Sequence, residues 1–164
     1  MAIVQRHKKL AFVGVKTGSQ SGSVSITYTR IHKFTTFTHN KNPQEYARQY
    51  VDEPFQETDV VGYAPSFDYG FDKYTGDPVQ AEIIKITDGE RLGDDAVLSI
   101  IVVDTEGDGT HVAYQRDYSV IPGAEGDNIN VYTYSGTMKA RGAAVKGTAT
   151  TSDDWETITF TADS

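Results

Sequence analysis

The feature that most constrains this chain is an alternation of side-chain character in residues 131–162, first over 132–141 and again, after a turn at 152–154, over 157–162. The apolar positions of its first part are Tyr132, Tyr134, Met138 and Ala140. The polar positions between them are Thr133, Ser135, Thr137, Lys139 and Arg141. A period of two predicts strands with one buried face and one polar face. The segment holds no nucleophile–base pair, metal-ligand cluster or phosphate loop, so its polar face indicates a contact surface.

Length and composition favour one β domain spanning residues 1–164, with a basic N-terminal arm and first strand over 1–22. A chain of 164 residues with 38% hydrophobic residues has enough material for one core and too little for two. No segment approaches the roughly 20 apolar residues of a membrane span, and the N-terminal residues do not form a signal peptide. We therefore expect no membrane association, and we expect synthesis in the cytoplasm. The chain has no cysteine, which excludes disulfides.

Further alternation predicts strands upstream of residue 131. The expected strands cover about residues 10–15, 23–30, 33–38, 67–74, 97–103 and 111–120. The segment 97–103 is apolar on both faces and is expected to be the most buried strand. In residues 111–120 we expect Val112, Tyr114, Tyr118 and Val120 to share one face.

Two segments carry helix-start signals. Asn42 is a capping residue, Pro43 fits the first helical position and Glu45 has capping-box spacing, which predicts a short helix over about residues 43–51. Asp77 followed by Pro78 predicts a second helix, which Gly89 should end. The fold class is therefore mainly β, a β-sandwich or open β-barrel with one principal flanking α-helix.

The net charge of −8 conceals a segregation along the chain. Residues 1–42 carry seven Lys/Arg and no Asp/Glu, whereas residues 43–108 carry sixteen acids against four bases. One interpretation is an acidic domain with a basic arm. The other is that opposite charges meet between copies of the chain in head-to-tail contacts.

Several features with a chemical appearance lack the pattern that the chemistry needs. Residues 104–109 begin like a calcium loop, but Gln115 stands where a bidentate Glu is required, so an Asp-Gly hairpin turn is favoured. The four histidines lack zinc-ligand spacing. The adjacent acids at 94–95 and 153–154 are typical of solvated turns. We expect no catalytic residue, cofactor or metal.

Four segments in order resemble the major tail tube proteins of long-tailed, non-contractile (siphovirus-type) bacteriophages. They are residues 131–162, the acidic stretch 42–53, the aromatic segment 66–74, and Asp77-Pro78 followed by 84–90. Together the resemblance covers roughly residues 30–163. Each motif is a weak pattern of strand, loop and aromatic residues, and their order carries the specificity.

The resemblance implies a virion structural protein that forms stacked hexameric rings of the phage tail tube. Its partners would be further copies of itself, a tape-measure protein inside the tube, and terminator and distal tail proteins at the ends. Double-stranded DNA would pass through the lumen without sequence-specific binding during ejection. Assembly would take place in the host bacterial cytoplasm, and the protein would reside in the virion.

The resemblance also implies which surfaces make contacts. Residues 40–63 match the long loop between rings, and its apolar residues on an acidic stretch are expected to contact the next ring. These inter-ring residues are Tyr46, Tyr50, Phe55, Val60 and Val61. The candidates for lining the lumen are Ser23, Ser25, Thr27, Thr29, Thr133, Ser135 and Thr137. Lys139 and Arg141 do not suit a purely negative lumen, and the sequence leaves open which sheet faces it.

Three alternatives remain at the level of sequence. The tube of a contractile injection system, including the type VI secretion tube, shares the fold, and no residue pattern excludes it. A carbohydrate-binding β-sandwich module is a different class, which the single tryptophan and the charge segregation disfavour. A small glycosidase or esterase has the least support.

Overall fold

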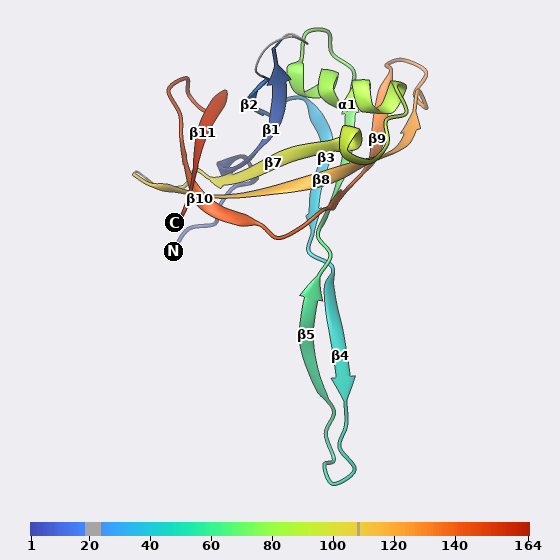
Figure 1. The fold of residues 1–164 in the computed structure, drawn as a ribbon, viewed down its shortest axis with the longest axis vertical. Helices are drawn as coiled ribbons and strands as arrows, with labels where there is room; N and C mark the ends of the chain where they lie inside the picture. Colours follow the sequence, from blue (N-terminus) through green and yellow to red (C-terminus); the bar gives the residue numbers. More distant parts are fainter. Residues whose placement is uncertain (19–23, 108) are drawn as a thin grey trace.

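The computed structural model describes residues 1–18, 24–107 and 109–164 and is mainly β, with one α-helix against the sheet (Figure 1). The mainly β class with a flanking helix, predicted from the sequence, is confirmed. The strands are β1 (Lys9–Thr17), β2 (Ser25–Arg30), β3 (Phe34–Asn40), β4 (Pro43–Arg48), β5 (Glu57–Tyr63), β6 (Ser66–Asp72), β7 (Val97–Asp104), β8 (His111–Glu125), β9 (Thr133–Ala140), β10 (Val145–Thr150) and β11 (Thr157–Ala162). The helix is α1 (Pro78–Asp88), and the short 3-10 turns are η1 (Arg6–Lys8) and η2 (Gly93–Ala96).

Nine strands form one sheet, part of which closes into a barrel. Their order is β10-β11-β2-β1-β7-β8-β9-β6-β3, and β10 also pairs with β8. This extra antiparallel pairing closes six strands, β10, β11, β2, β1, β7 and β8, into a ring. The remaining strands β9, β6 and β3 continue the sheet from the far end of β8. Closure removes edges that would otherwise pair with other chains, but β3 pairs on one side only within the described residues.

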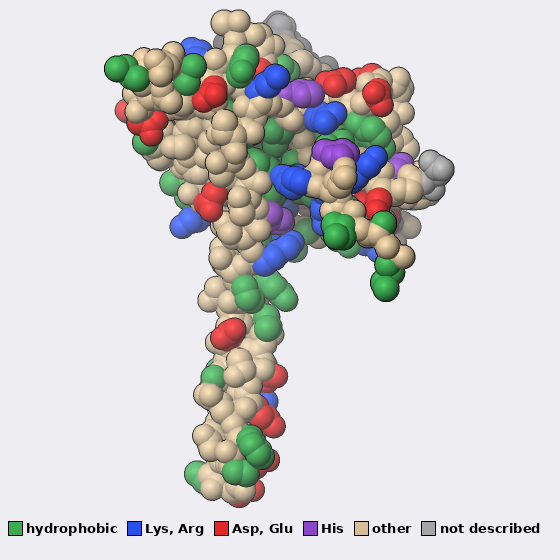
Figure 2. Space-filling model, turned by 180° about the vertical axis from the view of Figure 1, so that it is seen from behind, with side chains coloured by type: hydrophobic (Ala, Val, Ile, Leu, Met, Phe, Trp, Pro, Cys, Tyr) green, Lys and Arg blue, Asp and Glu red, His purple; other side chains and the backbone are tan. Residues whose placement is uncertain are grey.

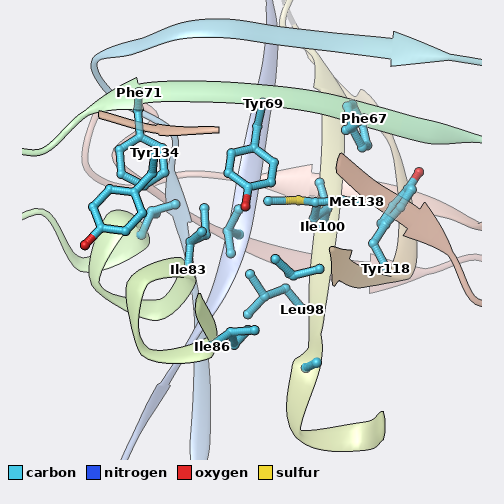
Figure 3. Packing of buried hydrophobic residues seen from close by; sticks show 14 of the residues in the cluster. Phe67, Tyr69, Phe71, Ile83, Ile86, Leu98, Ile100, Tyr118, Tyr134 and Met138 are labelled. Atoms are coloured by element: carbon cyan, nitrogen blue, oxygen red, sulfur yellow. The ribbon is translucent and has the colours of Figure 1, made fainter. Parts of the chain in front are cut away.

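Two apolar clusters share the strands between them. One fills the barrel and comprises Phe12, Ile101, Val103, Ala113, Ala149 and Ile158. The other lies between the sheet and α1, where Ile83 and Ile86 of the helix meet Leu98 and Ile100 of β7 (Figure 3). Because successive side chains of a strand point to opposite faces, β7 supplies both clusters. That is why the segment 97–103 has apolar residues on both faces, and none of its residues is exposed. Its prediction as the most buried strand was wrong, because β6 has five buried residues of seven whereas β7 has four of eight.

The apolar face predicted for β8 is buried along only half of its length. Tyr118 and Val120 are buried in the cluster with α1, but Val112 and Tyr114 are 40% and 49% exposed. Ala113 points into the barrel instead. Because β8 runs from the barrel into the sheet with β9, only its second half lies in the larger cluster. Residues 112, 114, 118 and 120 thus lie on one face as predicted, and that face is buried only in its second half.

The residues at its two ends determine where α1 begins and ends. The Asp77 carboxylate accepts hydrogen bonds from the backbone N–H of Val79 (2.9 Å) and Gln80 (3.0 Å), and Pro78 occupies the first turn. Gly89 follows the last helical residue, as predicted. The buried Gln80 side chain donates to the Asp72 carbonyl (3.1 Å) and accepts from the Tyr74 N–H (2.8 Å), which fixes the helix to the end of β6.

The prediction of a short helix over residues 43–51 is wrong. Pro43–Arg48 form β4, which pairs with β5 in a separate two-stranded ribbon that projects from the body (Figure 1). Asn42 does not cap a helix. Its φ is 46°, and its side-chain amide donates to the Ala64 carbonyl (3.1 Å) and the Ser66 hydroxyl (3.2 Å). The backbone groups of β4 find partners across the ribbon, and no neighbouring surface exists there to bury a helical apolar stripe.

Candidate assembly surfaces

The projecting ribbon, which we call the hairpin, consists of residues 43–63. At its root the Asn42 side chain, on the outgoing chain, donates to Ala64 and Ser66 of the returning chain, and the Ala64 N–H donates to the Asn42 carbonyl (3.1 Å). A register shift between Gln44 and Glu45 leaves Val61 without a partner across the ribbon. The root is thus fixed to the start of β6, while the rest of the hairpin extends away from the body (Figure 1).

One face of the hairpin is organised around Arg48. Its guanidinium pairs with Glu57 (3.2 Å) and with Asp59, and its Nε donates to the Tyr50 hydroxyl (3.1 Å). The guanidinium carbon lies 5.7 Å from the Tyr46 ring centroid and 5.9 Å from that of Tyr50. Exposed ion pairs contribute little individually, but this cluster combines charge pairs with cation–π contacts. It holds the two tyrosines in place on one side of the ribbon.

The five predicted inter-ring residues all lie on the hairpin and are exposed. Their exposed fractions are Tyr46 54%, Tyr50 50%, Phe55 77%, Val60 54% and Val61 65%. They do not form one face. Tyr46 lies opposite Asp59 on the Arg48 side, Val60 lies opposite Glu45 on the other side, and Phe55 is in the turn. A partner that buries all five has to surround the hairpin.

The candidates for lining the lumen fall on two separated strands. Ser25, Thr27 and Thr29 are on β2 in the barrel, and Thr133, Ser135 and Thr137 are on β9 in the extension. Between β2 and β9 lie β1, β7 and β8, so the two groups do not form one surface in a single chain. Ser23 lies outside the described residues.

Two of the polar groups on β9 are already engaged within the chain. The Ser135 hydroxyl donates to the Ala124 carbonyl (3.2 Å), and the Thr133 hydroxyl donates to Asp127. Arg141, which follows β9, pairs with Asp94 of the same chain (2.9 Å). On β2 the Ser25 and Thr17 hydroxyls lie 2.8 Å apart, and Ser25 and Thr27 are exposed. The β2 group therefore presents the freer polar surface of the two.

A cluster of cations was not predicted from the sequence. Arg6, Lys9, His39, Lys41 and Arg116 surround two adjoining hollows of about 410 Å³ and 300 Å³, which share Lys9, His39 and Lys41 in their walls. Apolar side chains form the floor, namely Phe37, Phe67, Ile100, Val102 and Tyr118. We call this site the basic pocket. Figure 2 shows Lys, Arg and His side chains gathered on the body above the hairpin, with acidic side chains along the hairpin itself.

The basic pocket carries an excess of positive charge. Among the described residues, no carboxylate lies within 4.0 Å of its Lys or Arg side chains. Burial, and after it the nearby cations led by Lys41, lowers the pKa of His39 to about 4. Burial and the charges of Arg116 and Lys9 also lower the pKa of Lys41. In the part of the chain described, the Arg116 Nε is buried without a hydrogen-bond partner.

The sequence contained only part of the signal for this pocket. The excess of Lys and Arg in residues 1–42 was visible, and it includes Arg6, Lys9 and Lys41. Arg116 reaches the same place from β8, a position that depends on the pairing of β8 with β7 and cannot be inferred from spacing along the chain.

Neither a metal site nor a membrane-spanning helix is present among the described residues. The described residues contain no group of three or more His, Asp or Glu side chains placed to hold a metal ion. In the same residues, no helix is both long and apolar enough to span a bilayer.

Comparison with known proteins gives similarity of structure only. No protein-family model and no curated protein matches the chain. A chain in the virion of a native gene transfer agent particle is similar with a TM-score of 0.57 and 12% identity, over 98% of this chain and 100% of that chain. A chain in the baseplate of the anti-feeding prophage, 6-fold symmetrised, is similar with a TM-score of 0.50 and 6% identity, over 89% and 96% of the two chains. This chain therefore shares its fold with components of these two assemblies.

Proposed function

We propose that this protein is the subunit of a phage-type tail tube, in which hexameric rings stack and DNA leaves through the lumen. The observation that carries the proposal is the hairpin. A two-stranded ribbon standing alone in water is marginally stable, and this one exposes seven large apolar or aromatic side chains. Contact with another subunit would bury those side chains and stabilise the ribbon.

The fold supports repeated self-assembly. The closed barrel and α1 give each subunit its own core, while the unpaired side of β3 offers backbone donors and acceptors to a neighbour in the ring. A head-to-tail contact that does not close on itself produces a filament. The similar chain from a gene transfer agent virion supports a place in a phage-like particle.

DNA passage follows from the same arrangement. The hydroxyl groups of Ser25 and Thr27 are exposed on β2 and carry no positive charge, so that surface would not hold phosphates. With a net charge of −8 per subunit, a tube would repel DNA and let it slide. The tape-measure protein would occupy the lumen before ejection, and terminator and distal tail proteins would close the ends.

A contractile-type inner tube is the second candidate function. It is favoured by the similar chain in the 6-fold symmetrised anti-feeding prophage baseplate, because both kinds of tube would use the same ring. The two candidates differ in whether a sheath surrounds the tube. A sheath protein encoded and purified together with this chain would support the contractile form.

Substitution in the hairpin tests the proposal. Val60→Asp combined with Val61→Asp places two charges at exposed apolar positions, so we expect an unchanged thermal unfolding midpoint of the free chain and loss of tubes by negative-stain electron microscopy. Ile129→Asp is the control, because Ile129 is also an exposed apolar residue (97%) but lies outside the hairpin. Tubes of normal length from the doubly substituted chain would contradict the proposal for the hairpin.

A further inference from the structure

We propose that the basic pocket receives the acidic and apolar tip of the hairpin from a second copy of the chain. This deepens the proposed function and rests on it, since it names the surface that accepts the hairpin. We define the tip as residues 50–56. The pairing would bring Asp52 and Glu53 to the cations of the pocket, and Val51 and Phe55 to its apolar floor.

The pocket lacks an anion that its chemistry requires. Lys9, Lys41 and Arg116 repel one another, and in the part of the chain described no carboxylate offsets them. The Arg6 guanidinium is fixed at the rim by donating to the carbonyls of Lys9 (2.9 Å) and Phe37 (3.2 Å). Such clustering of like charge costs stability unless an opposite charge joins it. A carboxylate from outside the chain would remove that cost.

The tip has the complementary composition. Glu57 and Asp59 of the hairpin are already paired with Arg48, but within the described residues Asp52 and Glu53 have no cation within 4.0 Å. Beside these two acids, Val51 and Phe55 are among the most exposed apolar side chains of the protein. The tip therefore offers two free carboxylates next to two apolar side chains. The pocket offers free cations around an apolar floor.

The tip cannot reach the pocket of its own chain. Lys41 lies at the hairpin root, and the ten or so extended residues from there to Asp52 place the tip about 35 Å away at roughly 3.3 Å per residue. The hairpin runs away from the body over this length (Figure 1). The occupant must therefore come from another copy.

This geometry produces a repeating contact. Since the pocket lies at the root of the hairpin, a translation of about one hairpin length along its direction brings the tip of one copy level with the pocket of the next. The same contact then repeats without closing, as a head-to-tail filament requires. It also accounts for the opposite charges of residues 1–42 and 43–108, because the first segment supplies most of the pocket's cations and the second supplies the tip.

Two charge-reversal variants of the full-length chain, one in the pocket and one in the tip, test this contact. A third variant combines both sets of substitutions. The pocket variant is Lys9→Glu with Lys41→Glu, both exposed positions, and the tip variant is Asp52→Lys with Glu53→Lys. The control is Lys16→Glu with Lys73→Glu, which makes the same charge change at exposed positions outside the pocket. We expect each reversal alone to reduce tube formation at least tenfold, the combined chain to recover it, and the control to assemble normally.

Carbodiimide cross-linking gives a second readout. The reagent joins a carboxylate to an amine with loss of water, and mixing isotope-labelled and unlabelled chains identifies links between copies. In assembled wild-type tubes, we expect a link between Lys41 and Asp52 or Glu53 of different copies. Absence of this link from assembled tubes would overturn the proposal.

The outcomes separate this inference from the proposed function. If the wild-type chain never forms rings or tubes, the tube function itself fails. If wild-type tubes form and the pocket variant assembles equally well, only the inference fails. If the pocket variant loses tubes but the tip variant keeps them, a free anion such as phosphate is the occupant and the inference is again wrong. Unfolding midpoints of all variants confirm that the fold is intact.

Discussion

Two phenylalanines of this chain lie in opposite surroundings. Phe71 on β6 is 1% exposed and packs with its ring centroid 4.8 Å from Phe34 and 5.5 Å from Tyr134. Phe55 at the tip of the hairpin is 77% exposed. The first side chain contributes to folding of the single chain. The second gains a comparable burial only when another copy covers it.

Truncation of each phenylalanine should therefore act on different quantities. We expect Phe71→Ala to lower the free energy of unfolding by about 3–5 kcal/mol, because it removes a buried ring and leaves a cavity. Phe55→Ala should leave that free energy within about 0.5 kcal/mol of the wild type but reduce tube assembly. Urea denaturation and electron microscopy measure the two effects. A large loss of stability in Phe55→Ala would contradict the exposed position of the tip.

His39 makes the stability of the free chain depend on pH. Its ring stacks on Phe67 with centroids 4.2 Å apart, and burial, together with the neighbouring cations led by Lys41, lowers its pKa to about 4. An unfolded histidine titrates near 6.5. Between these values the unfolded chain binds a proton that the folded chain does not, so stability falls as pH decreases from about 6.5 to about 4.

The His39→Gln variant isolates this contribution. We expect its free energy of unfolding to change less between pH 6.5 and pH 4 than that of the wild type, by urea denaturation at low protein concentration. His7→Gln is the control, since His7 is exposed on η1. Equal pH dependence in His39→Gln and wild type would show that His39 is not held in its neutral form.

At the scale of elements, the sequence predicted best where local signals and tertiary packing agree. The Asp77 cap, Pro78 and Gly89 specified α1, and the apolar positions Ile83 and Ile86 found the sheet to pack against. The equally good cap signal at Asn42 failed, because that segment leaves the body and has no surface to cover. A cap fixes where a helix begins only if packing supports the helix.

The pairing of distant strands explains what the sequence could not predict. Tyr134 and Met138 were correctly placed on a buried face by the period of two alone. The basic pocket was not predicted, because it joins η1, β1, the end of β3 and β8 through the strand order of the sheet. The predicted inter-ring residues lie on the hairpin, and the described lumen candidates lie on β2 and β9. Their contacts with other subunits remain predictions.

The close approach of β8 and β9 near the end of the sheet depends on Gly136. A Cβ at this position would lie 2.6 Å from the Ile121 carbonyl oxygen and 2.8 Å from the Gly123 nitrogen, both backbone atoms that cannot rotate away. We expect Gly136→Ala to lower the free energy of unfolding by about 1–3 kcal/mol, as overpacking does.

Gly62 on β5 is the matched control for Gly136, since its added Cβ would meet only the Gln44 side chain at 3.9 Å. Gly62→Ala should change the free energy of unfolding by no more than about 0.5 kcal/mol. Chemical denaturation of both variants measures the difference. Equal effects of the two substitutions would contradict the register of β8 and β9.

At the scale of the whole molecule, the distribution of charge and the elongated hairpin both favour head-to-tail assembly. The body carries the basic pocket at the root of the hairpin, and the hairpin carries at its far end two acids that pair with no cation of the described residues. A molecule with complementary ends of this kind is suited to head-to-tail repetition. Screening by salt should weaken such contacts where they are exposed.

Electron microscopy of the concentrated wild-type protein tests the central claim most directly. We expect hollow rings and tubes of uniform diameter, sixfold symmetry in end-on averages, and an axial repeat of about 35 Å set by the length of the hairpin. Particles no larger than one chain at every concentration and salt condition would contradict the account.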